Sequence, residues 1–172
     1  MQIPGTIPTW FREVFINGLI EATWFPRALR WIALRFVGID TKRAMFQAKI
    51  CFGGRNVKVG YQASINEYVY LGAHAQITLG DYVGLGARVM ILTATHEITD
   101  VMLRHGPLEL RPVTIGRGSM IGAGSLIMPG VTIGEGVVVG AGSVVAKDCE
   151  PNAVYIGNPA RLVRRLEPLR QE

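Results

Sequence analysis

The sequence has few cysteines and few histidines, and it lacks a long uninterrupted apolar run. Its two cysteines, Cys51 and Cys149, lie far apart and form neither a CxxC pair nor a disulfide framework, which favours a reducing cytoplasm and two buried thiols. Arginine and glutamate side chains interrupt the apolar N-terminal stretch from residue 12 onward, and a cleavage site is not evident there. We therefore expect neither a signal peptide nor a membrane span.

The chain is rich in glycine and in basic residues. It contains 21 glycines in 172 residues without the every-third-residue rule of collagen, and its hydrophobic content of 49% predicts a globular fold. The formal net charge of +5 suits an anionic ligand, an anionic membrane surface or nucleic acid. Only the charge favours nucleic acid, because no basic motif with interleaved aromatic residues or recognition helix is present, so no nucleic-acid partner is predicted.

A period of six residues organises the C-terminal half of the chain. From Val113 the sequence divides without a gap into VTIGRG, SMIGAG, SLIMPG, VTIGEG, VVVGAG and SVVAKD. The third place is always aliphatic (Ile115, Ile121, Ile127, Ile133, Val139 and Val145) and the first is Val or Ser. A short strand followed by a tight glycine turn explains this pattern, and such units bury their side chains only by stacking. The period therefore predicts an all-β solenoid, a parallel β-helix.

An earlier block repeats the pattern more loosely and ends at a histidine. Its aliphatic positions are Val59, Ile65 and Leu71, and then, after a two-residue slip, Leu79, Leu85 and Ile91. The period is absent from residues 97–112, and a loop of this length inside a compact repeat is more often functional than idle. His96 stands at the mouth of that loop, in the stretch TATHEITD.

The two ends of the chain follow other patterns. Six apolar residues recur at helical spacing between Trp10 and Ala22, Pro26 breaks the run, and RALRWIALRFV (27–37) predicts a second amphipathic helix that ends at Gly38. The tail after Pro159, ARLVRRLEPLR, predicts a short basic helix or extended strip. We divide the chain into an N-terminal helical segment (1–45), a β-helix with its loop (46–158) and a basic C-terminal segment (159–172).

These motifs together resemble a known family. ILTATHEITD, PGVTIG, the Lys-Asp turn and GNPAR, set among the hexapeptides, are similar to the hexapeptide-repeat O-acetyltransferases of the galactoside, maltose and nodulation-factor type. The likeness covers roughly residues 57–166, about two thirds of the chain. It implies a left-handed parallel β-helix with three units per coil, a homotrimer with active sites between subunits, acetyl-CoA as donor and no metal.

The resemblance also assigns roles to single residues. His96 matches the catalytic general base, and Ala123 matches the position whose backbone N–H stabilises the oxyanion. Contacts to CoA are carried over to a group of small and basic residues: Ala141, Ala146, Lys147, Arg161 and Arg164, with Arg165 as a weaker addition. The alternative for the basic strip RLVRR is a solvated face or a subunit contact.

For the acceptor, Asn66 matches an asparagine that contacts the sugar. His74 stands where the family has a sugar-binding acid, and Met120 stands where it has an aromatic residue beside the acetyl site. The predicted function is O-acetylation of a saccharide hydroxyl in surface polysaccharide or glycoconjugate biosynthesis. Because of these two departures, an acceptor linked to a nucleotide or a lipid fits better than a simple free sugar. The segment WFPRALRWIALRFVG resembles the leaders of acetyltransferases in polysaccharide biosynthesis.

Three alternatives stay open at this point. A zinc-dependent carbonic anhydrase of the γ class shares the scaffold and would need His74, His96 and His105 to converge, although their spacing does not follow that family's pattern. A non-catalytic β-helix scaffold is the second. For residues 10–37, packing on the β-helix or a neighbouring subunit is slightly favoured over contact with a membrane surface. The predicted location is cytoplasmic, with the membrane periphery as the alternative.

Overall fold

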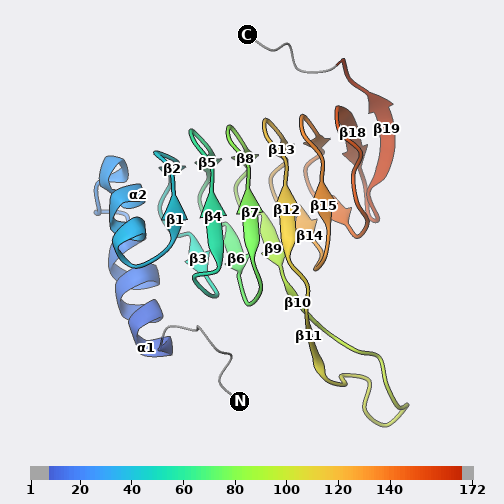
Figure 1. Cartoon of the computed structure of the whole chain (residues 1–172), viewed down its shortest axis with the longest axis horizontal. Helices are drawn as coiled ribbons and strands as arrows, with labels where there is room; N and C mark the ends of the chain where they lie inside the picture. The colour runs from blue at the N-terminus through green and yellow to red at the C-terminus, as the bar shows by residue number, and fades with distance from the viewer. Residues whose placement is uncertain (1–7, 168–172) are drawn as a thin grey trace.

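A computed structural model describes residues 8–167 as a parallel β-helix with helices at one end and an antiparallel hairpin at the other (Figure 1). Each coil contributes one strand to each of three sheets, which we name A, B and C. Sheet A contains β1 (Asp40–Thr41), β4 (Val57–Val59), β7 (Ile77–Leu79), β12 (Val113–Ile115) and β15 (Thr132–Ile133). Sheet B contains β2 (Met45–Phe46), β5 (Ser64–Ile65), β8 (Gly84–Leu85), β13 (Met120–Ile121), β16 (Val138–Val139), β18 (Ala153–Ile156) and β19 (Arg161–Arg165). Sheet C contains β3 (Cys51–Phe52), β6 (Tyr70–Gly72), β9 (Met90–Leu92), β14 (Leu126–Ile127) and β17 (Val144–Val145).

The register between coils explains the irregularity seen in the sequence. Thr114 pairs with Thr132, a separation of 132 − 114 = 18 residues, which is three units of six. Val57 pairs with Ile77, a separation of 77 − 57 = 20 residues. The two additional residues lie between β6 and β7, at the corner that joins sheet C to sheet A, and the strands on either side keep their pairing.

The repeating aliphatic positions form the core, as the period predicts. All six third-place residues from Ile115 to Val145 are buried, and the first-place residues are buried beside them. The first-place serines also bond to turn carbonyls: Ser119 Oγ donates to Gly134 O at 2.8 Å and Ser125 Oγ donates to Gly140 O at 3.0 Å. A small polar residue recurs there because it fits inside the coil and its hydroxyl donates to a turn carbonyl.

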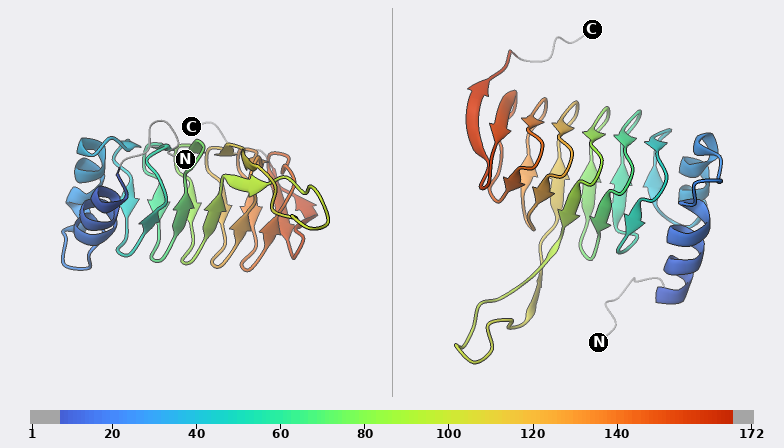
Figure 2. Two further views of the ribbon diagram at one scale, coloured as in Figure 1. Left: turned by 90° about the horizontal axis from the view of Figure 1, so that it is seen from below. Right: turned by 180° about the vertical axis from the view of Figure 1, so that it is seen from behind.

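Two helical segments cover the first coil of the solenoid (Figure 2). The first consists of α1 (Thr9–Phe11) and a π-helix, η1 (Arg12–Ile20); the second is α2 (Arg27–Phe36). The predicted second helix is confirmed, whereas the first is mostly π-helical and buries Ile16 and Ile20. Within residues 8–167 neither segment is long and apolar enough to cross a bilayer.

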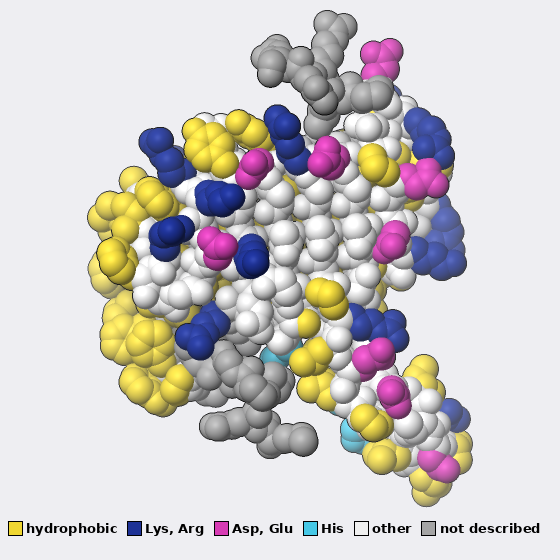
Figure 3. Space-filling model, viewed as in Figure 1, with side chains coloured by type: hydrophobic (Ala, Val, Ile, Leu, Met, Phe, Trp, Pro, Cys, Tyr) yellow, Lys and Arg dark blue, Asp and Glu magenta, His cyan; other side chains and the backbone are white. Residues whose placement is uncertain are grey.

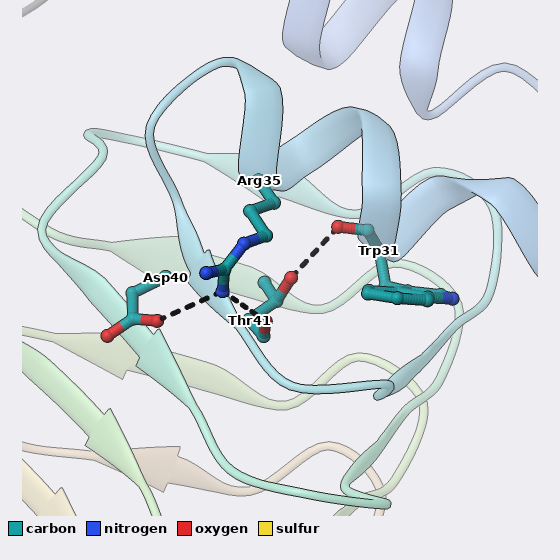
Figure 4. A network of polar contacts seen from close by, with 4 residues as sticks. All are labelled: Trp31, Arg35, Asp40 and Thr41. Carbon is teal, nitrogen blue, oxygen red and sulfur yellow. Dashed lines mark hydrogen bonds and ion pairs between the residues drawn. The ribbon is translucent and has the colours of Figure 1, made fainter.

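The second helix is tied to the first strand by backbone and side-chain contacts (Figure 4). Thr41 Oγ1 donates to Trp31 O at 2.9 Å, and Arg35 Nη1 donates to Thr41 O at 3.3 Å while lying 3.9 Å from a carboxylate oxygen of Asp40. Gly38 ends the helix with a φ of +90°, a left-handed conformation that glycine adopts without steric cost. The chain can therefore turn directly from the helix into β1.

The two cysteines differ in their surroundings. Cys149 is buried, and burial raises the pKa of its thiol to about 11. Cys51 is exposed, so the expectation of two buried thiols is wrong for this residue. The reason is strand alternation: Phe52 takes the inward position in β3, which turns Cys51 outward.

An acidic and a basic side chain are buried at the helical end of the solenoid. Glu21 Oε2 accepts from the Ile50 amide at 3.4 Å, and Arg30 Nη2 donates to Ala22 O at 2.6 Å and to Phe25 O at 3.0 Å. Among the described residues, Glu21 Oε1 and Arg30 Nε have no hydrogen-bond partner. Burial raises the pKa of Glu21 from 4.5 to about 8, although the nearby Arg30 opposes this shift.

Truncation of a core aliphatic should destabilise the solenoid far more than truncation of its outward neighbour. We expect Ile115→Ala to lower the free energy of unfolding by about 2 to 5 kcal/mol because it leaves a cavity between coils. Thr114→Ala, in the same strand but exposed, should cost less than about 1 kcal/mol. Denaturant titration measures both values, and equal losses would contradict the assigned core.

The raised pKa of Glu21 should make stability depend on pH. The folded state holds a proton that the unfolded chain releases above pH 4.5, so this contribution to stability is complete below pH 4.5 and is lost as the pH rises to about 8. Glu21→Gln should flatten that slope, whereas Glu135→Gln, an exposed control, should leave it unchanged. Unfolding free energies measured from pH 5 to 9 test this, and an identical slope in Glu21→Gln would refute it.

Candidate functional site

An arm leaves the solenoid between sheets C and A and carries His96. It is an antiparallel hairpin of β10 (Ala94–His96) and β11 (Leu108–Leu110), so part of the segment expected as an irregular loop is regular strand (Figure 1). Thr93 anchors its base: the buried hydroxyl donates to Gly72 O at 2.6 Å and accepts from the Ala75 amide at 2.8 Å. The first Thr of TATH thus fixes where the arm begins.

The ring of His96 is held in one orientation by the returning part of the arm. Its Nδ1 lies 2.8 Å from Gly106 O, and because a carbonyl can only accept, Nδ1 must carry the proton. Nε2 of the neutral ring is then an acceptor, and the side chain is exposed. This is the tautomer that a general base needs, with its lone pair directed away from the bond that orients it.

Asn66, Ala123 and Ala141 lie together at a second corner, which joins sheet B to sheet C. Ala123 O accepts from the Gly142 amide at 2.9 Å, so Ala123 and Ala141 stand in neighbouring coils, while the Ala123 amide donates to no acceptor within residues 8–167. Asn66 Nδ2 donates to Leu85 O at 2.9 Å, and Leu85 belongs to the coil between the coil of Asn66 and the coil of Ala123. A Cβ on Gly86 would lie 2.6 Å from the Ala123 nitrogen, so only glycine permits this approach.

A cleft of about 460 Å³ opens beside Ala123. Its walls come from three successive coils: Glu67 and Tyr68, Ala87 and Arg88, and Ala123 and Gly124. Lys49 Nζ donates to the Tyr68 hydroxyl at 2.9 Å and lies 5.0 Å from the centre of that ring, and Arg88 Cζ lies 5.9 Å from the same ring. Glu67 and Arg88 therefore line the same cleft as the free Ala123 N–H, and Lys49 lies against the Tyr68 side chain in its wall.

Three residues at this corner have a left-handed backbone conformation that sequence reasoning missed. Lys49, Tyr68 and Arg88 have φ values of 61°, 60° and 60°, whereas the later coils place Gly124 and Gly142 in the same conformation. A non-glycine residue there costs roughly 1 kcal/mol or more, but Gln62 and Tyr82 have the same conformation at the corner between sheets A and B, so this strain is a feature of the early coils and not of the cleft alone. The only available signal was the replacement of the turn glycine by Lys, Tyr and Arg in the early coils.

His74, Ala146 and Lys147 lie at the corner between sheets C and A, on the side from which the arm leaves. The Lys-Asp turn is fixed by Asp148 Oδ1, which accepts from the Thr132 amide at 2.7 Å, and it leaves Lys147 exposed. His74 is half-buried, and its carbonyl accepts from Asn56 Nδ2 at 3.1 Å. Met120, the position expected to be aromatic, is exposed on β13.

The basic C-terminal segment is an extended strand, β19, paired antiparallel with β18. Arg161 pairs with Ile156 and Arg164 with Val154, and the register shifts by one residue between them. This bulge places Arg161 and Arg164 on the same face of the strand although they are three residues apart. Arg165 belongs to the other face, where it bonds to Glu150 Oε2 at 2.6 Å.

Within one chain the structure therefore places the candidate residues at two corners and on strands of sheet B rather than in one pocket. The oxyanion position and Asn66 lie at the corner between sheets B and C, whereas His96 and Lys147 lie on the side between sheets C and A. The rings of His96 and His105 are 6.2 Å apart, and His74 is on a different element. Over residues 8–167 no group of three His, Cys, Asp or Glu side chains is arranged to hold a metal ion.

Sequence comparison places the chain among hexapeptide transferases. Residues 112–147 match the family model described as bacterial transferase hexapeptide (six repeats). Nodulation protein L of Rhizobium meliloti is 44% identical over 113 residues, which are 65% of this chain and 61% of that protein. Galactoside O-acetyltransferase of Escherichia coli is 34% identical over 113 residues, 66% of this chain and 56% of the relative. The chain thus spans about six tenths of the length of the curated relatives it matches.

Solved structures extend the likeness over nearly the whole chain. A maltose O-acetyltransferase from Clostridium difficile 630 superposes with a TM-score of 0.76 at 36% identity, covering 92% of this chain and 84% of that one. A hexapeptide-repeat acetyltransferase from Vibrio cholerae O1 biovar eltor, solved with acetyl-CoA, has a TM-score of 0.81 at 27% identity and covers 91% and 86%.

These similarities confirm the resemblance and the fold expected from the sequence, a left-handed parallel β-helix with N-terminal helices and a short basic C-terminal segment. The chain belongs to the hexapeptide-repeat acetyltransferase family.

Proposed function

We propose that this chain is an acetyl-CoA-dependent O-acetyltransferase that modifies a saccharide hydroxyl, with His96 as general base. The observation that carries the proposal is the hydrogen bond from His96 Nδ1 to Gly106 O, which leaves Nε2 free to accept a proton on an exposed arm. Acetyl-CoA is bound in a solved relative from Vibrio cholerae, which supports the donor. A non-catalytic scaffold would have no need for an oriented imidazole.

In this proposal His96 Nε2 takes the proton of the acceptor hydroxyl as its oxygen attacks the thioester carbonyl carbon. The carbonyl C–S bond then breaks, and the imidazolium returns the proton to the leaving sulfur, so the residue ends the cycle neutral. The Ala123 N–H donates to the developing oxyanion, a role for which a main-chain group is sufficient. No covalent enzyme intermediate is required.

The separation of the two corners supports a homotrimer with sites between subunits. Within one chain His96 lies on one side of the solenoid, and Ala123 and Asn66 lie on another. In an oligomer His96 of one copy can face Ala123 and Asn66 of a neighbouring copy. The arm also exposes apolar side chains that a neighbour would cover: Ile98, Val101, Met102, Leu103 and Leu108. We place the assembled enzyme in the cytoplasm.

Small and basic residues fit the donor. Ala141 and Ala146 present no bulk at two corners of one late coil, so a narrow chain such as pantetheine could approach the backbone at either corner. Lys147, Arg161 and Arg164 are exposed cations that suit the phosphates of CoA. The bulge in β19 supports a joint role for the two arginines because it turns them to one face.

The cleft beside Ala123 favours a charged acceptor. Asn66 and Glu67 can bond to sugar hydroxyls, while Arg88 and Lys49 suit a phosphate attached to the sugar. We therefore propose a nucleotide-linked or lipid-linked precursor in surface polysaccharide or glycoconjugate biosynthesis as acceptor. His74 lies at the other corner, so its part in acceptor binding would be from a neighbouring copy.

His96→Ala should lower turnover by about 10²- to 10⁴-fold while leaving the affinity for CoA nearly unchanged, because it removes the base and no phosphate contact. His105→Ala, on the same arm, is the matched control and should change turnover only a few-fold. Thiol release from acetyl-CoA in a screen of saccharide acceptors measures both. Unchanged turnover in His96→Ala would refute the assigned base.

Lys147→Ala and Arg161→Ala should each raise KM for acetyl-CoA by about tenfold, or about 1.4 kcal/mol, with little change in kcat. Arg117→Ala, an exposed cation at the corner between sheets A and B, is the charge-matched control. Steady-state kinetics and calorimetric titration with acetyl-CoA provide the readouts. No binding by the parent chain would indicate a scaffold, and equal effects in all three variants would refute the phosphate contacts.

A further inference from the structure

The helical cap presents an apolar surface that the β-helix does not cover. We call this surface the cap face; its members are Trp10, Val14, Phe15, Leu19, Trp24, Leu29 and Phe36, which are 40% to 87% exposed. The helices turn Ile16, Ile20 and Leu34 toward the first coil, whereas the members of the cap face point to solvent. Figure 3 shows hydrophobic side chains gathered over the helical end of the molecule. Contiguous patches of this kind mark binding surfaces.

Two hollows in the cap face combine apolar walls with an arginine. One, of about 400 Å³, is lined by Trp10, Phe11, Phe36 and Arg55 together with neighbouring residues. The other, of about 530 Å³, is lined by Trp31, Ile32, Arg35 and Phe36. Phe36, 87% exposed, borders both. An apolar hollow beside a guanidinium group suits an acyl chain that carries an anionic headgroup.

The charge around the cap face identifies the occupant. From the helices to Arg55, the exposed cations whose side chains the structure describes include Arg27, Arg35, Lys42, Arg43 and Arg55, and the exposed acids among the described side chains are Glu13 and Asp40. Figure 3 shows Lys and Arg side chains beside the hydrophobic ones. A second copy docked through the same face would bring two such basic margins together, which is unfavourable. An anionic bilayer complements the margin and also accommodates the aromatic side chains.

We propose that the cap face is a docking surface for anionic lipid bilayers. Trp10, Trp24 and Phe36 lie at headgroup depth, and the flanking Lys and Arg side chains contact lipid phosphates. The contact is interfacial, since no helix within residues 8–167 can cross a bilayer. This inference concerns location and is independent of acetyl transfer, because the helices lie at the end of the solenoid away from β18 and β19 (Figure 2).

The tryptophans allow a direct test on the full chain. All three, Trp10, Trp24 and Trp31, belong to the cap, so intrinsic tryptophan emission reports only on this region. We expect a blue shift and co-sedimentation with vesicles of phosphatidylcholine containing about one third phosphatidylglycerol, and much weaker binding to phosphatidylcholine alone. Binding should fall as salt is raised. Equal binding to both vesicles, or to neither, would overturn the proposal.

Substitutions of exposed residues separate the apolar and the electrostatic contributions to vesicle binding without disturbing the core. Trp24→Ser combined with Phe36→Ser should weaken co-sedimentation at least tenfold, whereas Met102→Ser, 89% exposed on the arm, should not change it. Arg27→Glu with Lys42→Glu should weaken binding to the anionic vesicles, and Arg104→Glu is its control on the arm. If Trp24→Ser with Phe36→Ser instead alters the mass of the assembly by light scattering and leaves vesicle binding intact, the cap face is a subunit contact and the proposal fails.

Discussion

The structure depends on one constraint: a coil of this solenoid can bury its aliphatic side chains only beneath the neighbouring coils. Each short strand pairs in parallel with the strand above and the strand below, so one coil cannot be stable alone. Inside the stack every strand has a partner on each side. The first and last coils each have one side without a partner coil, and that side must be covered in another way. At the start η1 and α2 cover the first coil, and at the end β19 pairs antiparallel with β18.

Stacking also determines where function can lie. The inward side chains of the strands are committed to the core, whereas the corners are exposed and align from coil to coil, so residues far apart in sequence form one column. Lys49, Tyr68, Arg88 and Ala123 come from four different coils and meet at the corner between sheets B and C. The arm interrupts another corner, and the buried Thr93 hydroxyl fixes its start with one donated and one accepted hydrogen bond. A rigid frame thereby holds both a cleft and a projecting imidazole.

Much of the fold could be predicted because its signals are local and repeated. The six-residue period predicted the inward Ile and Val side chains, and Gly38 predicted the end of the second helix. The exposure of Cys51 was not evident, since it depends on which residue of a two-residue strand faces the core. The helical spacing from Trp10 to Ala22 also did not reveal that η1 would be π-helical and leave Val14 and Leu19 exposed.

The candidate site was also predicted only in part from the sequence. The residues TATH and the repeats, with their resemblance to a family, were sufficient to single out His96 and the basic strip, because these signals lie in contiguous stretches. The tertiary structure decided three things: the bond that orients His96, the bulge that aligns Arg161 with Arg164, and the assignment of His96 and Ala123 to different corners. Each of these depends on contacts between segments distant in the chain, which a one-dimensional period does not encode.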